Sequence, residues 1–302
     1  MSNTRAVPVL ALSLLGISFA GPLVHLSDSD PLVIAAWRLI FSLVIVAIAL
    51  GITSEWREWK RLTGRDVVFA AASGVALALH FWAWNASIHL TTIAASVTLV
   101  SLQPAFIVAI SAIFLREAPT RRQLAGISVA IIGAMLIAAP AWRESGAAFS
   151  RGAMLGNLLA TSAAVTAAIY YSIGRHLRGK FGLWAYVGLA YSACALALLA
   201  IALFTDVPVA PQPRRELAIF AALAIGPMLL GHTGMNWALK YMPAYVVNLV
   251  TLGEPVGATL LGAILPGIRQ VPSLTTLSGG AIILAGVALA AWTTVSPRRG
   301  AA

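Results

Sequence analysis

Long apolar runs separated by short polar gaps make up almost all of this 302-residue chain. A helix that crosses the ~30 Å hydrocarbon core of a bilayer needs about 20 mostly apolar residues. Ten runs approach that length, and they cover residues 6–26, 31–51, 66–87, 92–115, 122–140, 152–174, 183–204, 216–238, 243–265 and 273–294. The pattern therefore predicts an all-α integral membrane protein with ten transmembrane helices.

The gaps between the runs leave no room for a soluble domain. The two longest gaps, residues 51–65 and 141–151, are rich in charged residues, glycine or serine. The first run follows Arg5 and has some features of a signal peptide, but nine more runs follow it, so we interpret it as an uncleaved first span. A large enzymatic module is excluded for the same lack of space.

The composition agrees with a lipid environment. Of the residues, 60% are hydrophobic and only 10% are charged, and the mean hydropathy is +0.89. Ordinary soluble domains carry about 25% charged residues, because their surface needs polar cover. The net charge of +10 is spread over the gaps between apolar runs rather than over one folded face. We therefore expect the lipid bilayer, and no nucleic acid, as a partner.

Successive loops alternate between the two sides of the membrane, and the basic residues are distributed unequally between these sides. With the N-terminus in the cytoplasm, 14 Lys and Arg face the cytoplasm and 5 face the outside, while Arg38 lies within a span. Cytoplasmic loops carry the excess of basic residues, so both termini are predicted to be cytoplasmic. Arginine far outnumbers lysine, and alanine and glycine are abundant, which suggests a high-GC bacterial source and hence the bacterial inner (plasma) membrane.

The sequence repeats itself once. The segment VTLVSLQP ends at Pro104 and VNLVTLGEP ends at Pro255, while LAGISVAIIGAML pairs with LSGGAIILAGVAL further along each half. We expect a five-helix repeat in residues 1–140 and a second one in residues 151–295. Because five is an odd number, the second repeat must be inverted in the membrane relative to the first. Many secondary transporters are built in this way.

Several of these segments resemble the EamA family of the drug/metabolite transporter superfamily. ALKYMPAYVVNLVTLGEPVGATLLGAI looks like part of the second EamA repeat, and FLREAPTRRQLAGISVAIIGAMLI like part of the first. The likeness covers nearly the whole chain and implies a ten-helix carrier, usually an exporter of amino acids or other small metabolites. Amino-acid exporters of the YddG type are the nearest members. One departure is that the second repeat lacks a counterpart of Glu117.

Polar and aromatic residues within the spans form the predicted substrate site. His80 and His232 fall in corresponding helices of the two repeats, and Trp84 and Asn236 follow them at the i+4 spacing that shares a helix face. Aromatic rings can stack on an organic substrate. The candidate substrate-binding residues are His80, Trp84, Gln103, Tyr171, His232, Asn236 and Glu254. The alternative for the histidines is a hydrogen-bonded packing role.

Four residues are candidate hinges: Pro104, Pro255, Pro227 and Gly231. A proline removes one helical hydrogen bond and clashes with the preceding turn, and small residues let helices approach or slide. Pro104 and Pro255 lie near the midplane of their spans, directly after Gln103 and Glu254. The two kinks are therefore predicted to line a central site between the repeats, although prolines can also bend helices purely for packing.

Glu254 is the only acid deep within a predicted span. A charged side chain at the midplane costs at least ~2.5–3.5 kcal/mol on insertion scales, so Glu254 faces a watery cavity, is protonated, or pairs with a base. It could bind substrate or carry a coupling proton. Arg38 is the only basic residue well inside a span, but its depth differs from that of Glu254. We expect Arg38 to snorkel outward or to bind helix carbonyls rather than to pair with Glu254.

These features favour a secondary transporter that works by alternating access and takes a small-molecule substrate. No GxxxxGK[ST] loop is present, so energy would come from the substrate gradient or a coupled ion. A membrane channel for small solutes or ions is the alternative, but no filter-like segment or charge ring supports it. The chain has no nucleophile–base motif and no metal-ligand spacing, so we expect no enzyme activity, catalytic residue, metal or cofactor. The oligomeric state stays open.

Overall fold

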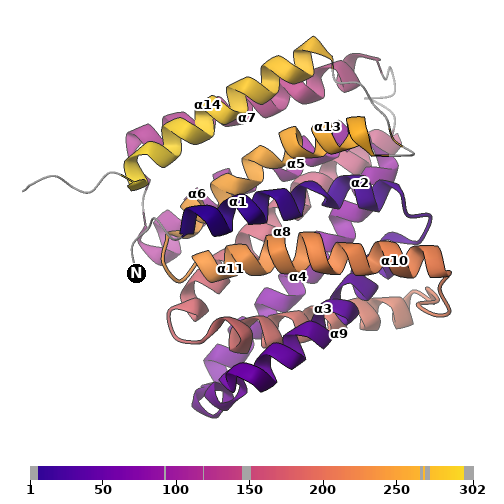
Figure 1. The fold of residues 1–302 in the computed structure, drawn as a ribbon, viewed down its shortest axis with the longest axis vertical. Coiled ribbons are helices and arrows are strands. Elements are labelled where there is room, and N and C mark those ends of the chain that lie inside the picture. Colours follow the sequence, from indigo (N-terminus) through magenta and orange to yellow (C-terminus); the bar gives the residue numbers. More distant parts are fainter. Residues whose placement is uncertain are drawn as a thin grey trace, which may run out of the picture.

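The computed structural model describes residues 6–91, 93–117, 119–144, 151–265, 268 and 273–295. Every regular element in these ranges is helical, and Figure 1 shows the helices packed side by side. In chain order they are α1 (Ala6–Ser18), α2 (Ala20–His25), α3 (Pro31–Thr53), η2 (Glu55–Arg61), α4 (Gly64–Leu90), α5 (Ile93–Val100), α6 (Gln103–Ile110), η3 (Ser111–Leu115), α7 (Arg121–Glu144), α8 (Arg151–Arg178), α9 (Leu183–Phe204), α10 (Arg214–Leu223), η5 (Ala224–Thr233), α11 (Gly234–Ala238), α12 (Ala244–Asn248), η6 (Leu249–Gly253), α13 (Glu254–Ile264) and α14 (Leu274–Val295).

Most of these helices are long and apolar enough to cross a bilayer. Within the described ranges, eight stretches meet that standard: Ala6–His25, Pro31–Thr53, Gly64–Leu90, Ala95–Leu115, Arg151–Arg178, Leu183–Phe204, Arg214–Ala238 and Ala244–Ile264. A shorter apolar stretch, Leu274–Ala290, lies in α14. Large apolar side chains such as Leu203 and Phe114 point outward, where lipid tails would cover them. The protein is an all-helical, multi-pass membrane protein, as the sequence predicted.

Several of the spans are interrupted. The span Ala95–Leu115 breaks between α5 and α6, and the span Ala244–Ile264 passes through the 3₁₀ helix η6 before α13 begins. Pro104 and Pro255 stand in the first turns of α6 and α13, where the missing N–H removes no helical bond. Pro227 lies inside η5, a π-helical stretch of the span Arg214–Ala238. The interruptions at the prolines predicted as kinks are therefore present.

Helices α7 and α14 form a close pair along one edge of the bundle (Figure 1). A Cβ atom on Gly126 would lie 2.6 Å from the carbonyl oxygen of Gly286, and one on Gly133 would lie 2.7 Å from that of Gly279. Real Cβ atoms do not approach backbone so closely, so only glycine permits this contact. Because Gly126 meets Gly286 and Gly133 meets Gly279, the two helices run antiparallel. Small residues are typical of such contacts between membrane helices.

Helix α1 packs against η5 and α13 near the centre of the bundle. A Cβ atom on Gly231 would lie 2.5 Å from Cγ2 of Ile17, and the Ser13 hydroxyl donates to the carbonyl oxygen of Leu230 at 3.0 Å. The candidate hinge Gly231 therefore leaves room for α1 to approach η5. Cys194 of α9 is buried.

Candidate functional site

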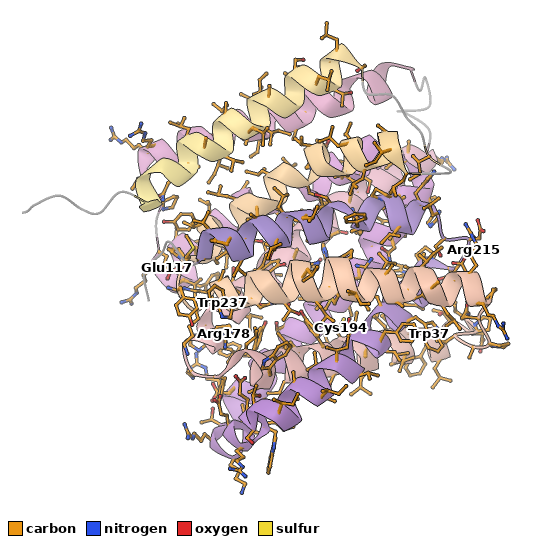
Figure 2. All side chains as sticks on the ribbon, viewed as in Figure 1. Trp37, Glu117, Arg178, Cys194, Arg215 and Trp237 are labelled. Atoms are coloured by element: carbon orange, nitrogen blue, oxygen red, sulfur yellow. The ribbon has the colours of Figure 1, made fainter. Side chains whose placement is uncertain are left out.

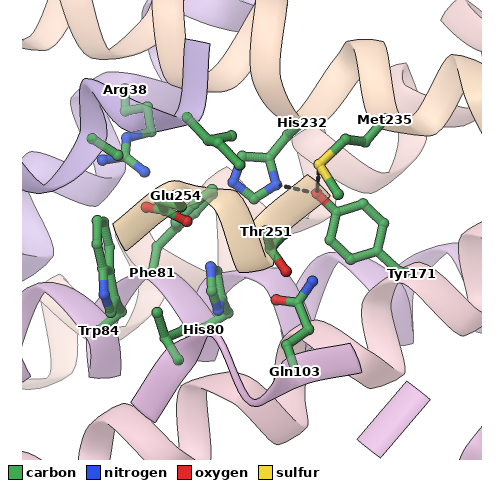
Figure 3. Close-up of a pocket in the computed structure, with 13 residues that line it drawn as sticks. Arg38, His80, Phe81, Trp84, Gln103, Tyr171, His232, Met235, Thr251 and Glu254 are labelled. Carbon is green, nitrogen blue, oxygen red and sulfur yellow. Dashed lines mark hydrogen bonds between the residues drawn. The ribbon is translucent and has the colours of Figure 1, made fainter. Parts of the chain in front are cut away.

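A small cavity lies where broken helices from both halves of the chain meet (Figure 3). Six of the seven predicted substrate-binding residues line it: His80, Trp84, Gln103, Tyr171, His232 and Glu254. Its volume is about 30 Å³. A buried water needs roughly 10–15 Å³, so the cavity has room for about two waters and none for an organic molecule. In this structure the side chains leave little free space at the site.

The two repeat-matched histidines face each other in this cavity. The ring centroids of His80 and His232 are 5.9 Å apart. The Tyr171 ring is stacked on His232 with an interplanar angle of 6°, and its hydroxyl lies 2.8 Å from His232 Nδ1. The Phe81 ring meets His232 edge-on at 5.1 Å. The aromatic wall is therefore built from α4, α8 and η5 together.

Hydrogen bonding fixes the orientation of His80. Its Nδ1 lies 2.9 Å from the carbonyl oxygen of Ala163, and a carbonyl can only accept, so Nδ1 carries a proton. A neutral His80 then has Nε2 as an acceptor. Within the ranges that the structure describes, no group of three or more His, Cys, Asp and Glu side chains is arranged to hold a metal ion.

Arg38 also lines the cavity, and this corrects the sequence prediction. The residue is 0% exposed, so it does not snorkel to the surface. Its Cζ atom lies 4.6 Å from the centroid of the Phe81 ring, a cation–π contact. Arg38 and Glu254 therefore share one cavity despite their different depths along the chain (Figure 3). The prediction failed because α3 turns this face inward, where a long side chain spans several ångströms of depth.

Three N–H donors on lining residues have no hydrogen-bond partner among the described residues. They are Nε and Nη2 of Arg38 and the indole Nε1 of Trp84. Leaving a buried donor unsatisfied costs about 1–3 kcal/mol, and more when the donor is charged. Such groups are found where a ligand supplies the acceptors. With the carboxyl group of Glu254 in the same cavity, the site can offer donors to an anionic group and an acceptor to a cationic one.

A polar network joins the two interrupted helices beside the cavity. The side-chain amide of Gln103 donates to Oδ1 of Asn248, across the two halves of the chain. Thr251 Oγ1 donates to the carbonyl oxygen of Asn248 at 2.8 Å, and the Ser101 hydroxyl lies 3.3 Å from the carbonyl oxygen of Thr251. These bonds satisfy polar groups near the helix breaks, which lipid could not do. Asn248 was not identified from the sequence.

Asn236 is the one predicted binding residue that does not line the cavity. Its amide donates to the carbonyl oxygen of His232 at 2.8 Å and to the hydroxyl of Tyr170. The residue is fully buried, and its backbone carbonyl oxygen accepts from Nε of Arg178 at 3.0 Å. The i+4 spacing placed it on the helix face of His232, but the bond from its side-chain amide to Tyr170 holds the side chain against α8. None of the four candidate hinges lines the cavity, although Pro104, Pro255 and Gly231 each stand next to a lining residue in the sequence; the fourth is Pro227.

Several lining residues were not predicted, because apolar residues within apolar runs carry no distinguishing signal. Phe81, Met235 and Ile17 are of this kind, and Thr251 resembles other small polar residues of the spans. Arg38 is different. A lone acid and a lone base, both deep within spans, are each costly in lipid, and their joint presence was a signal for a shared polar cavity.

Ionic contacts join the two halves of the chain on either side of the cavity. Arg175 Nη2 lies 2.8 Å from Oε1 of Glu117, and Arg175 Nη1 donates to the carbonyl oxygen of Leu239. Elsewhere, Arg215 Nη1 lies 2.7 Å from Oδ2 of Asp28. Figure 2 shows Glu117 and Arg215 at opposite ends of the bundle. We call these the Glu117 end and the Arg215 end.

The fold is that of a multi-pass membrane protein with a polar cavity among its spans, and its family match identifies it as a membrane transporter. Residues 6–139 and 154–292 each match the model of the EamA-like transporter family. The chain belongs to that family, which confirms the resemblance seen in its sequence.

Two curated relatives and one solved structure are similar over nearly their full lengths. An uncharacterized transporter from Archaeoglobus fulgidus is 26% identical over 93% of this chain and 96% of its own. A probable terminal-alkyne amino-acid exporter from Streptantibioticus cattleyicolor is 26% identical over 99% of this chain and 97% of its own. A crystal structure matches with a TM-score of 0.77 and 22% identity, covering 97% of this chain and 98% of that one. At this identity the structure supports the fold alone.

Proposed function

We propose that this protein exports a small zwitterionic metabolite, an amino acid or a close analogue, by alternating access around the cavity. The observation that carries the proposal is the fully buried Arg38, which has donors without partners among the described residues and lines the same cavity as Glu254. A guanidinium binds a carboxylate through paired, charge-assisted hydrogen bonds. Glu254 would accept from the substrate ammonium, and Trp84 and Tyr171 would contact its side chain. The amino-acid exporter among the relatives supports this substrate class.

We further propose that the chain has ten spans in two inverted repeats, residues 1–140 and 151–295. The sequence match aligns Gly126 with Gly279 and Gly133 with Gly286. In space, Gly126 meets Gly286 and Gly133 meets Gly279. A two-fold rotation that exchanges the repeats turns one contact into the other, as in a symmetric interface. Antiparallel packing of two corresponding helices, α7 and α14, supports the proposal that the repeats are inverted.

We place the Glu117 end in the cytoplasm of a bacterium, with the protein in the inner membrane and both termini inside. Basic residues gather at this end, and they include Arg57, Lys60, Arg61, Arg175 and Lys180. The positive-inside rule supports this orientation. Lys60→Cys should then be shielded from an impermeant thiol reagent in intact cells, and Arg214→Cys should be labelled. The native Cys194 is buried and would give little background. The reverse labelling pattern would contradict the orientation.

Alternating access would be a rocking of the repeats about the cavity. The contacts at the Glu117 end and the Arg215 end tie the halves together, and the cavity between them is small. Opening either end requires the contacts there to separate while those at the other end persist. The interrupted helices at Pro104 and Pro255 are the places where the backbone could bend, and the Gln103–Asn248 bond joins them.

Pro255→Ala is expected to slow transport severalfold with little effect on folding. Alanine restores a backbone N–H and favours a continuous helix through the break, so the access change would become harder. The measurements are the initial rate of substrate exchange in proteoliposomes and the melting temperature in detergent. Pro213→Ala, at the exposed start of α10, is the matched control. An exchange rate equal to that of wild type would remove Pro255 from the mechanism.

Purified protein in liposomes tests the function itself. Labelled amino acids should enter saturably, with accumulation changing when a pH gradient is imposed. The corresponding amino amides and simple carboxylic acids each lack one half of the zwitterion and should compete poorly. Unitary conductance in planar bilayers would instead support the channel alternative. Saturable flux of only uncharged or doubly anionic solutes would exclude a zwitterion as the substrate.

A further inference from the structure

A second, larger cavity lies outside the central site, between α4, α8 and the end of the fourth span. Its volume is about 610 Å³, and no residue lines both cavities. Volumes of about 300–1,000 Å³ are usual for small-molecule sites. The walls are mostly apolar, and they include Phe114, which is 77% exposed, and Ile169, which is 38% exposed. The cavity is therefore a groove that opens on the lipid-facing surface of the bundle.

Cationic and aromatic side chains gather at one end of this groove. The Cζ atom of Arg65 lies 5.3 Å from the centroid of the Phe69 ring, and the same ring meets His176 edge-on at 5.5 Å. All three residues line the groove. The neighbouring acid, Asp66, is paired with Lys180 at 2.7 Å, so it does not neutralise Arg65. This end of the groove is therefore positively charged.

The groove changes in polarity along α8. His176, Ser172, Ile169 and Val165 follow one another on a single helix face and all line it. The 11 residue steps from Val165 to His176 cover about 16 Å at 1.5 Å per residue. Ser172 is 5% exposed, and its hydroxyl has no hydrogen-bond partner among the described residues. A cationic end, a buried free hydroxyl and an apolar trough thus occur in that order.

We propose that this groove binds one anionic phospholipid of the surrounding membrane. Arg65 and His176 donate to the phosphate, the hydroxyl of Ser172 donates to a glycerol ester carbonyl, and one acyl chain lies along Ile169 and Val165. The order of groups from head to tail matches the order of residues along the groove. The site also lies at the Glu117 end, whose basic residues would draw anionic lipids. The proposal requires only that the protein is in a membrane and is independent of the transported substrate.

Native mass spectrometry of the purified full-length protein in an uncharged detergent tests this site. The probes are phosphatidylglycerol and phosphatidylcholine with identical acyl chains, added in titration. We expect one phosphatidylglycerol to bind more tightly than phosphatidylcholine, and Arg65→Gln to weaken it about tenfold, as expected for loss of a charge-assisted hydrogen bond. Arg61→Gln, which removes an exposed charge outside the groove, should change the affinity less than about twofold because salt screens distant charges.

A second pair of variants tests the trough without touching the charge. Val165→Trp fills the groove and should abolish tight binding, whereas Leu203→Trp, on the exposed face of α9, should leave it unchanged. Melting temperatures in the same detergent identify any variant that has failed to fold. Arg65→Gln and Val165→Trp change different parts of the groove, so each can test the proposal if the other fails to fold. Equal binding of the two lipids, or equal effects of Arg65→Gln and Arg61→Gln, would overturn the proposal. Oleate binding as tightly as phosphatidylglycerol would assign the groove to a single-chain lipid instead.

Discussion

Arg38→Gln is expected to weaken binding of a zwitterionic substrate by at least about 100-fold, because removing one partner of a buried ion pair costs about 3–5 kcal/mol. The guanidinium is 0% exposed and has two donors without partners among the described residues. A substrate carboxylate placed there would be left unpaired and desolvated in the variant. Affinity for the substrate, measured by calorimetry or competition in detergent, reports the effect.

A pair of ligands makes the Arg38 experiment specific. In wild type, an amino acid should bind far more tightly than its amide, which has no carboxylate. In Arg38→Gln the amino acid and its amide should bind nearly equally. The four affinities form a double-mutant cycle that measures the coupling between the Arg38 side chain and the substrate carboxylate. Arg38→Lys keeps the charge but loses the bidentate geometry and should fall between the two. If discrimination against the amide survives in Arg38→Gln, the carboxylate is bound elsewhere.

Glu254→Gln is expected to abolish accumulation driven by a proton gradient while leaving exchange between two equal substrate pools largely intact at saturating substrate. A buried carboxyl group can take either a substrate ammonium or a proton as access alternates, and that competition would link export to proton entry. Glutamine preserves the shape and much of the hydrogen bonding but does not titrate. Coupled flux in proteoliposomes, with and without the gradient, separates the two steps.

The first repeat offers a reason why Glu254→Gln could instead behave like wild type. Gln103 occupies the position that matches Glu254, and its amide is part of a satisfied network with Asn248. An amide is therefore tolerated at such a place in this fold. Gln103→Ala is the matched control, since it alters the corresponding position of the first repeat without touching a titratable group. Full accumulation by Glu254→Gln would show that the coupling proton, if there is one, is carried elsewhere.

The spans were predictable because a lipid environment forces long, uniformly apolar helices. The predicted run 183–204 coincides with α9, and most other boundaries moved by only a few residues. The interruptions at Pro104 and Pro255 could be predicted as well, because proline disturbs a helix at its own position in the sequence. The 3₁₀ helix η6 and the π-helical η5 were not, because a shift in hydrogen-bond register leaves the hydrophobic pattern unchanged.

Much of the central cavity could be predicted, because polar residues in lipid are costly and gather where they satisfy one another. His80 and His232 were recognised by their matching places in the repeats. The inward orientation of Arg38 depends on the rotation of α3 about its axis and on the reach of a flexible side chain. Neither follows from position along a helix. Asn236 shows the converse, because local bonds to Tyr170 and His232 determine where its side chain lies.

The pairing of α7 with α14 also constrains how the protein is made. α7 is synthesised before the middle of the chain, yet its glycine face packs against α14, which is synthesised only after the helices from α8 to α13. Until α14 has been inserted, Gly126 and Gly133 lack the backbone that they contact in the folded protein. The α7–α14 contact therefore forms late, and a chain that stops short of α14 would expose this unfilled helix face to membrane quality control.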